Sequence, residues 1–227
     1  MDQSDGHSAI ALHQRIELTL SRCSSVGTIS IKNAARTRLH KNSDRFYIIT
    51  GGPGSGKTTL INALRSHGYF CTTEAGRGII QDQVAISGPA VPWQDPLLFA
   101  EMMLSWDMRS YHLAEETPGP VFFDRGVADV AAYLRLMGIP VPEHIQSAAM
   151  NFHYNRSIFL APPWREIFHP DVERKQDFSE AERTYQALVA TYNELSYELI
   201  ELPRASVDER LRFILGQIEA KSLERLY

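Results

Sequence analysis

The segment that most constrains this chain is residues 46–60, which read FYIITGGPGSGKTTL. An apolar run leads into a glycine-rich turn with the spacing GxxxxGK[ST], and Leu60, Ile61 and Leu64 follow at helical spacing. This order predicts a buried strand, a loop whose backbone N–H groups point inward, and a helix whose positive end faces the same point. A glycine-rich turn without a ligand is the competing interpretation. The agreement of strand, glycines, lysine, threonine and helix favours a phosphate-binding loop, or P-loop.

The motif also assigns roles to single residues. Lys57 is expected to place a mobile cation on the β- and γ-phosphates of ATP, and Thr58 to hold Mg²⁺. The complete set expected to bind the nucleotide is Gly51, Gly52, Pro53, Gly54, Ser55, Gly56, Lys57, Thr58 and Thr59.

Three charged residues outside the loop are further candidates. Asp124 ends the apolar run 121–124, where an acid can bind magnesium or its water ligands, although a helix N-cap is the alternative. Arg125 is expected to point into the same crevice and clamp a phosphate. Glu74 is a candidate general base for a substrate hydroxyl, and a role in complementing a helix dipole is equally compatible with its position.

Residues 162–178 are polar and basic and show no helical period, which is typical of a lid. Arginines on such a segment can neutralise charge that develops during phosphoryl transfer, so Arg165 and Arg174 join the candidate catalytic residues. A solvated loop is the plainer interpretation.

Composition excludes several classes of partner and site. A net charge of −4 over 227 residues provides no global basic field for nucleic acid, and two cysteines without metal-ligand spacing suggest neither a disulfide framework nor a zinc site. No long apolar run or signal-like start is present, so we expect a cytoplasmic protein without a membrane partner. The expected ligands are a nucleotide and an unidentified small-molecule acceptor, and the oligomeric state stays open.

The chain divides into a polar extension at 1–44, expected to be disordered, and a folded domain at 45–227. In the domain, short apolar runs alternate with helical patterns, which predicts an α/β fold with a parallel sheet covered on both faces. The expected strands are 46–50, 69–72, 121–124, 157–160 and 198–202. Three helix starts are expected from Asp95-Pro96, from Ser179 with Glu182, and from Ser206 with Glu209.

With these motifs in place, residues 45–216 resemble the AAA-type P-loop family that includes the nicotinamide-riboside kinase domain of bacterial NadR. The resemblance rests on GGPGSGKTTL at 51–60, TEAGR at 73–77, FFDRG and ADVAAY within 122–133, PPWR at 162–165, DVER at 171–174, and ELP with SVDERLRFIL at 201–215. It implies a five-stranded parallel sheet, as in nucleoside kinases, with the strand of Asp124 beside the strand that precedes the P-loop. The adenylyltransferase half of NadR has no counterpart in the 44 residues before that strand.

Two functions follow as hypotheses. The first is a small-molecule, nucleoside-like kinase that uses ATP and Mg²⁺. The alternative is a regulatory switch that hydrolyses ATP or GTP without an acceptor, although the NKxD and DxxG patterns of typical GTPases do not occur in the chain. A ring-forming motor is disfavoured because only one helix is expected after residue 202.

Overall fold

The computed structural model of the chain describes residues 43–168 and 177–224, so the predicted extension at 1–44 lies outside it except for its last two residues. Its elements in chain order are η1 (Ser43–Arg45), β1 (Phe46–Gly51), α2 (Lys57–Ser66), β2 (Phe70–Cys71), α3 (Ala75–Ile86), α4 (Pro96–Ala114), β3 (Val121–Asp124), α5 (Val127–Leu136), α6 (Glu143–Asn151), β4 (Ser157–Ala161), η2 (Arg165–Ile167), α7 (Phe178–Glu194), β5 (Glu198–Glu201) and α8 (Val207–Glu224).

The strands form one five-stranded sheet in the order β2-β3-β1-β4-β5, and every neighbouring pair is parallel. Tyr47 lies opposite Phe122, and Ile49 lies opposite Asp124. The five predicted strands and the expected position of the Asp124 strand beside the P-loop strand are therefore confirmed. This order brings the ends of β1 and β3 together at one edge of the sheet, where the site is built.

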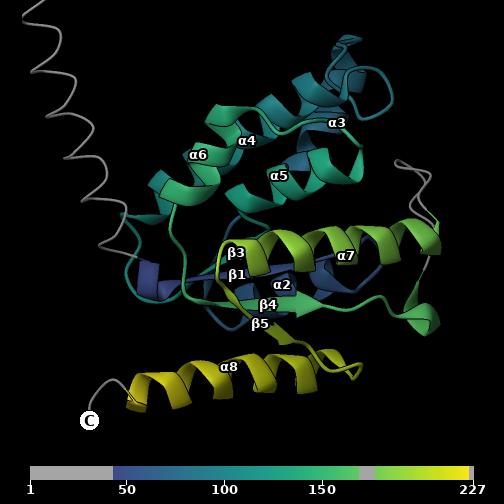
Figure 1. Ribbon diagram of the computed structural model, residues 1–227. Helices are drawn as coiled ribbons and strands as arrows, with labels where there is room; N and C mark the ends of the chain where they lie inside the picture. The colour runs from purple at the N-terminus through teal and green to yellow at the C-terminus, as the bar shows by residue number, and fades with distance from the viewer. Residues whose placement is uncertain (1–42, 169–176, 225–227) are drawn as a thin grey trace, which may run out of the picture. The chain divides into compact units, whose positions relative to one another are not determined.

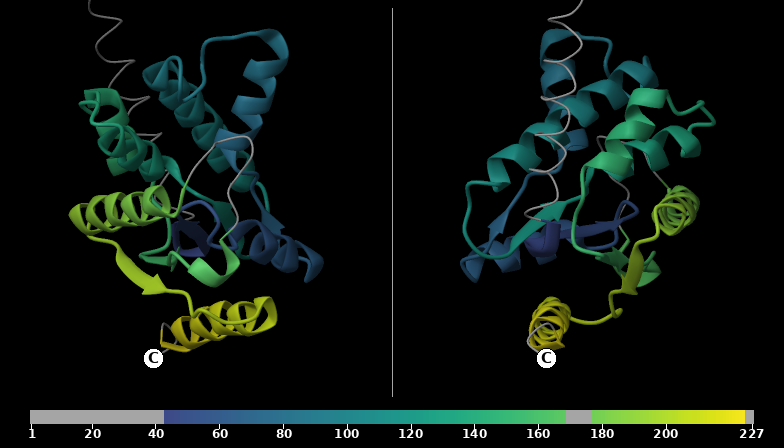
Figure 2. Two further views of the ribbon diagram at one scale, coloured as in Figure 1. Left: turned by 90° about the vertical axis from the view of Figure 1, so that its right-hand side faces the viewer. Right: turned by 60° about the vertical axis from the view of Figure 1, so that its left-hand side comes forward.

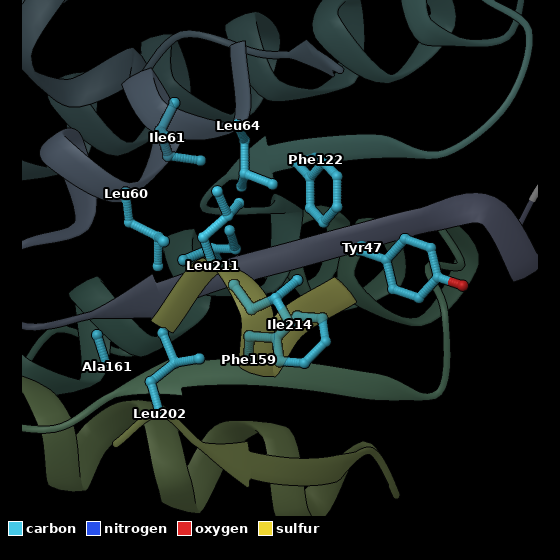
Figure 3. Packing of buried hydrophobic residues seen from close by; sticks show 11 residues of the cluster. Tyr47, Leu60, Ile61, Leu64, Phe122, Phe159, Ala161, Leu202, Leu211 and Ile214 are labelled. Carbon is cyan, nitrogen blue, oxygen red and sulfur yellow. The ribbon is translucent and has the colours of Figure 1, made fainter. Parts of the chain in front are cut away.

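One face of the sheet is covered by α2 and α8. Tyr47 and Ile49 point to this face, and Leu60 and Ile214 pack against them from the two helices. Figure 3 shows Tyr47, Leu60 and Ile214 in one apolar cluster, with Ile214 next to Phe159 of β4. Burying alternate residues of β1 in this way fixes the direction in which the P-loop leaves the strand.

The opposite face is covered by α4, α5 and α7, with α5 packed between the other two. Figures 1 and 2 show α8 on the far side of the sheet from α4, α5 and α6. Phe46, which points to this face, meets Tyr111 edge-on at 5.0 Å between ring centroids and Phe123 at 5.1 Å. None of the described helices is long and apolar enough to cross a membrane.

The helix starts test the capping predictions. Asp95 caps α4 through its carboxylate, and Ser206 with Glu209 forms the expected reciprocal pair before α8. The pair Ser179 and Glu182 is wrong: Asp177 is the N-cap of α7 and accepts from the Glu180 amide at 2.8 Å. Because the helix already starts at Phe178, Ser179 lies inside its first turn, where its hydroxyl is not needed as a cap.

Candidate active site

The P-loop turns tightly between β1 and α2. Gly54 and Gly56 have φ values of 67° and 78°, a region that L side chains rarely adopt. Lys57 folds back across the loop, and its Nζ donates to the carbonyl oxygens of Gly51 at 2.8 Å and Gly52 at 2.7 Å. The loop is therefore compact, with its lysine inside the curve, and Thr58 lies exposed in the first turn of α2.

The segment after β4 packs on the loop but does not bring its arginine to the cluster of acids. A Cβ at Gly54 would lie 2.5 Å from the Phe168 ring, so this aromatic residue requires glycine there. The Arg165 guanidinium lies 4.0 Å from the centre of the Phe178 ring and borders a separate surface hollow with Glu201 and Arg204. Arg174 lies outside the described residues, so the roles expected for both arginines stay predictions.

Asp124 ends β3 beside the loop and is 6 % exposed. Its backbone N–H donates to Thr72 Oγ1 at 3.0 Å, while its Oδ1 is buried without a hydrogen-bond partner among the described residues. Burial and the nearby Glu74 raise the pKa of Asp124 to about 6, against the opposing effect of Lys57. The N-cap alternative for Asp124 is wrong, because Gly126 is the N-cap of α5 and donates to Asp129 Oδ2 at 3.1 Å.

Glu74 and Arg125 form an ion pair at the start of α3. The Arg125 Nε donates to Glu74 Oε1 at 3.2 Å, and the two side chains are 17 % and 12 % exposed. Glu74 occupies the N-cap position of α3, yet its side chain makes no capping hydrogen bond. Glu74 therefore pairs with Arg125 at the positive end of α3, and its two expected roles, general base and complement of the helix dipole, stay predictions.

The backbone of Arg125 is held in an unusual conformation, with φ at 72° and its N–H donating to the Ile49 carbonyl of β1 at 3.1 Å. Burial lowers the pKa of Arg125, but the carboxylates of Glu74, Asp129 and Asp124 outweigh that effect and raise it overall. A strained position that is held this firmly is typical of a functional site.

Asp129, which was not among the expected site residues, ties the cluster to the fold. Its Oδ1 accepts from Thr50 Oγ1 and from Arg125 Nη1, the latter at 3.3 Å, and its Oδ2 accepts from Tyr192 OH at 2.5 Å. These contacts connect β1, α5 and α7, so they fix the orientation of the arginine.

A cavity of about 330 Å³ opens beside this cluster, which is within the usual range for small-molecule sites. Pro53 of the loop, Glu74 and Arg125 are among the residues that line it. The remaining wall is largely apolar and comes from α3, α4, α5 and α7; it includes Ile80, Phe99, Met103, Val130, Tyr133 and Leu188.

Two polar groups in this wall were missed by the sequence analysis. Burial, together with the carboxylate of Asp129, raises the pKa of Asp107 well above its usual value. The Tyr133 hydroxyl is buried without a hydrogen-bond partner in the described part of the chain. Asp107 could have been identified from the sequence, because it follows Phe99 and Met103 at four-residue spacing on the apolar face of α4.

The segment 88–112 contributes aromatics in three different ways. Tyr111 is fully buried in the core and donates to the His153 carbonyl at 2.7 Å. Phe99 is buried but also lines the cavity, whereas Trp93 lines the cavity and is 60 % exposed.

A family model described as an AAA domain matches residues 46–210. The chain belongs to this AAA domain family. The match covers every predicted strand and most of the domain expected at 45–227, and it agrees with the resemblance inferred from the motifs. No curated protein matches the chain.

Among solved structures, the AAA domain is similar to a NadR protein in complex with NR, at 17 % identity and a TM-score of 0.55, over 81 % of this chain and 52 % of that chain. A second NadR structure, with NAD and AMP-PNP, gives 17 % identity and a TM-score of 0.54 over 80 % of this chain and 50 % of that one. The chain thus spans about half the length of these NadR structures.

Deoxyadenosine kinase from M. mycoides, solved with dCMP and dCDP, is similar over 77 % of this chain and 99 % of its own, at 13 % identity and a TM-score of 0.50. At these identities, the likeness to both proteins shows a shared fold. The P-loop kinase fold expected from the sequence is therefore the fold of this AAA domain.

Proposed function

We propose that the chain is an ATP-dependent kinase that transfers the γ-phosphate to a hydroxyl group of a nucleoside-like acceptor. The observation that carries this proposal is a cavity lined both by Pro53 of the P-loop and by the Glu74–Arg125 pair. A hydrolase that acts only on water needs no such apolar chamber beside its phosphates. The fold shared with NadR and deoxyadenosine kinase supports a nucleoside-like acceptor.

The nucleotide site of this proposal is the P-loop from Gly51 to Thr59. Its amides and the N-terminal end of α2 favour an anion, and Lys57 supplies a cation that exchanges loop carbonyls for phosphate oxygens. The carbonyls that Lys57 now contacts belong to the loop itself, so the exchange requires only a movement of the lysine side chain.

Mg²⁺ fits the acids and hydroxyls present. The buried Asp124 Oδ1 has no hydrogen-bond partner in the described residues, and an oxygen of this kind suits the metal or one of its water ligands. Thr58 and Asp124 would hold the ion, which supplies charge neutralisation at the β- and γ-phosphates. The described residues contain no group of three or more acids, histidines or cysteines for a metal, and Mg²⁺ bound together with phosphates requires none.

In the transfer step, the acceptor oxygen forms a bond to the γ-phosphorus and its proton passes to Glu74. The bond from the γ-phosphorus to the bridging oxygen breaks, and its electron pair leaves with ADP. Arg125 orients the Glu74 carboxylate through the 3.2 Å contact and places a positive charge beside the reacting groups. The cytoplasmic location and the roles of Arg165 and Arg174 remain predictions.

The test uses the full chain with γ-labelled ATP, Mg²⁺ and a panel of nucleosides and ribosides. We expect label in one acceptor class, and its loss in Lys57→Ala. Arg109→Ala, which removes an exposed cation on α4 away from the cavity, is the matched control and should keep the activity. ATP hydrolysis at the same rate with and without every acceptor would overturn the kinase proposal in favour of the switch.

A further inference from the structure

Arg210 lies in the first part of α8, within the segment SVDERLRFIL, but no role was expected for this side chain from the sequence. Its side chain is 2 % exposed, and its Nη1 donates to the carbonyl oxygen of Ser55 at 3.0 Å. This hydrogen bond joins residues 155 positions apart in the chain and connects the last helix to the phosphate-binding loop.

Within the described part of the chain, the charge of Arg210 has no acidic partner. No carboxylate within residues 43–168 and 177–224 forms an ion pair with it, and its buried Nε has no hydrogen-bond partner in those residues. Burial lowers the pKa of Arg210. A buried cation without an anion is costly to the fold, so a functional reason for keeping it is needed.

The position of the hydrogen bond suggests that reason. The Ser55 carbonyl and the Gly56 N–H belong to one planar peptide unit and point in opposite directions. By holding the carbonyl on the α8 side, Arg210 turns the Gly56 amide to the other side of the loop. Glycine is favoured at this position because its φ is 78°, and a Cβ on residue 56 would lie 2.8 Å from Arg210 Nη1 and displace the guanidinium.

We propose that Arg210 is a positioning residue for the nucleotide: it fixes the Ser55–Gly56 peptide so that the Gly56 amide donates to the polyphosphate, and that polyphosphate supplies the missing negative charge. The inference rests on the proposed binding of nucleotide at the P-loop. Two cations would then act on the P-loop: Lys57 on its inner side and Arg210 on its outer side.

The experiment compares the wild-type chain with Arg210→Met and Arg210→Lys. Calorimetry with ADP should show affinity lowered roughly 10-fold or more in Arg210→Met, as for loss of a charged hydrogen bond, and a smaller loss in Arg210→Lys. The thermal midpoint of ligand-free Arg210→Met should be unchanged or higher, because an unpaired buried charge has been removed. Arg212→Met, which changes an exposed arginine on the same helix, is the control for both measurements.

A purely structural brace would give the reverse result: Arg210→Met would melt at a lower temperature, and its ADP affinity would equal that of the wild type in the folded protein. That result would overturn the inference. Failure of the wild-type chain to bind ADP would instead refute the nucleotide site itself. Binding of ADP without phosphorylation of any acceptor would refute only the kinase proposal, and the Arg210 comparison would still stand.

Discussion

At the scale of single residues, the site places two carboxylates in different environments. Glu74 shares its Oε1 with the Arg125 guanidinium, whereas Asp124 is more deeply buried and has an oxygen without a partner in the described residues. Different surroundings give neighbouring acids different roles. This contrast is why we assign proton transfer to Glu74 and the metal or its waters to Asp124.

Glu74→Gln tests the proton-transfer role. Glutamine keeps an oxygen that accepts from Arg125 but cannot take a proton, so we expect kcat for the acceptor to fall about 10²- to 10⁴-fold. The KM for ATP should change little, since the P-loop is untouched. Steady-state kinetics measures both, and Asp82→Asn, which alters an exposed acid on the same helix, should behave as wild type. An unchanged kcat would assign the proton to another group.

Asp124→Asn tests the electrostatic cost of the site. Burial raises the pKa of Asp124 to about 6 in the fold, so the folded state holds this proton more tightly than the unfolded state. Stability from this group is present at low pH and is lost as pH rises from about 4 to 6. Urea unfolding should therefore find Asp124→Asn more stable than wild type at pH 8, on the order of 2 kcal/mol, with the difference vanishing near pH 3. Equal stability at both pH values would contradict this account.

Residues with a fixed local spacing were predictable, and residues that act across the fold were not. Lys57 and Asp124 follow from a motif and from a strand end. Arg210 reaches the loop only because α8 packs beside α2, and the Tyr133 hydroxyl matters only because α5 borders the cavity. Nothing in the local sequence of either residue reports those neighbours.

At the scale of elements, the strands were predictable because each is a short apolar run bounded by turn residues. The start of α7 was not, because Asp177 and Ser179 are both good caps and the chain used the earlier one. The packing of α8 on α2 was also beyond the sequence, although the apolar spacing of Leu211, Ile214 and Ile218 showed that this helix must cover something.

Ile214→Ala tests how much the packing of α8 on the sheet contributes to stability. Ile214 is fully buried between α8 and the sheet, so truncation should lower the free energy of unfolding by about 2–4 kcal/mol. Urea denaturation gives the value, and Glu219→Ala, at an exposed position of the same helix, should change it by less than about 0.5 kcal/mol. Similar values for the two variants would mean that α8 is not an essential part of the core.

At the scale of the whole molecule, the sheet order brings two parts of the site, the phosphate-binding loop and the cavity, to one edge of the sheet. The P-loop leaves β1, the acid follows β3, and the cavity lies under α3, α4, α5 and α7 beside them. A kinase requires both the P-loop and a cavity for the acceptor, whereas a nucleotide switch requires only the P-loop. The two functions are therefore separable by closing the cavity alone.

Met103→Trp closes it, because Met103 lines the cavity and tryptophan fills much of its space. We expect acceptor phosphorylation to fall at least 10-fold while ATP affinity stays within about 3-fold of wild type, since no P-loop residue changes. Met102→Trp is the control, because it places the same bulk on the same helix. The Met102 side chain does not line the cavity and borders instead a separate hollow beside β2. If acceptor phosphorylation survives Met103→Trp unchanged, the acceptor lies elsewhere and the link between cavity and reaction fails. Loss of phosphorylation in Met103→Trp alone would assign the cavity to the acceptor and leave the switch without support.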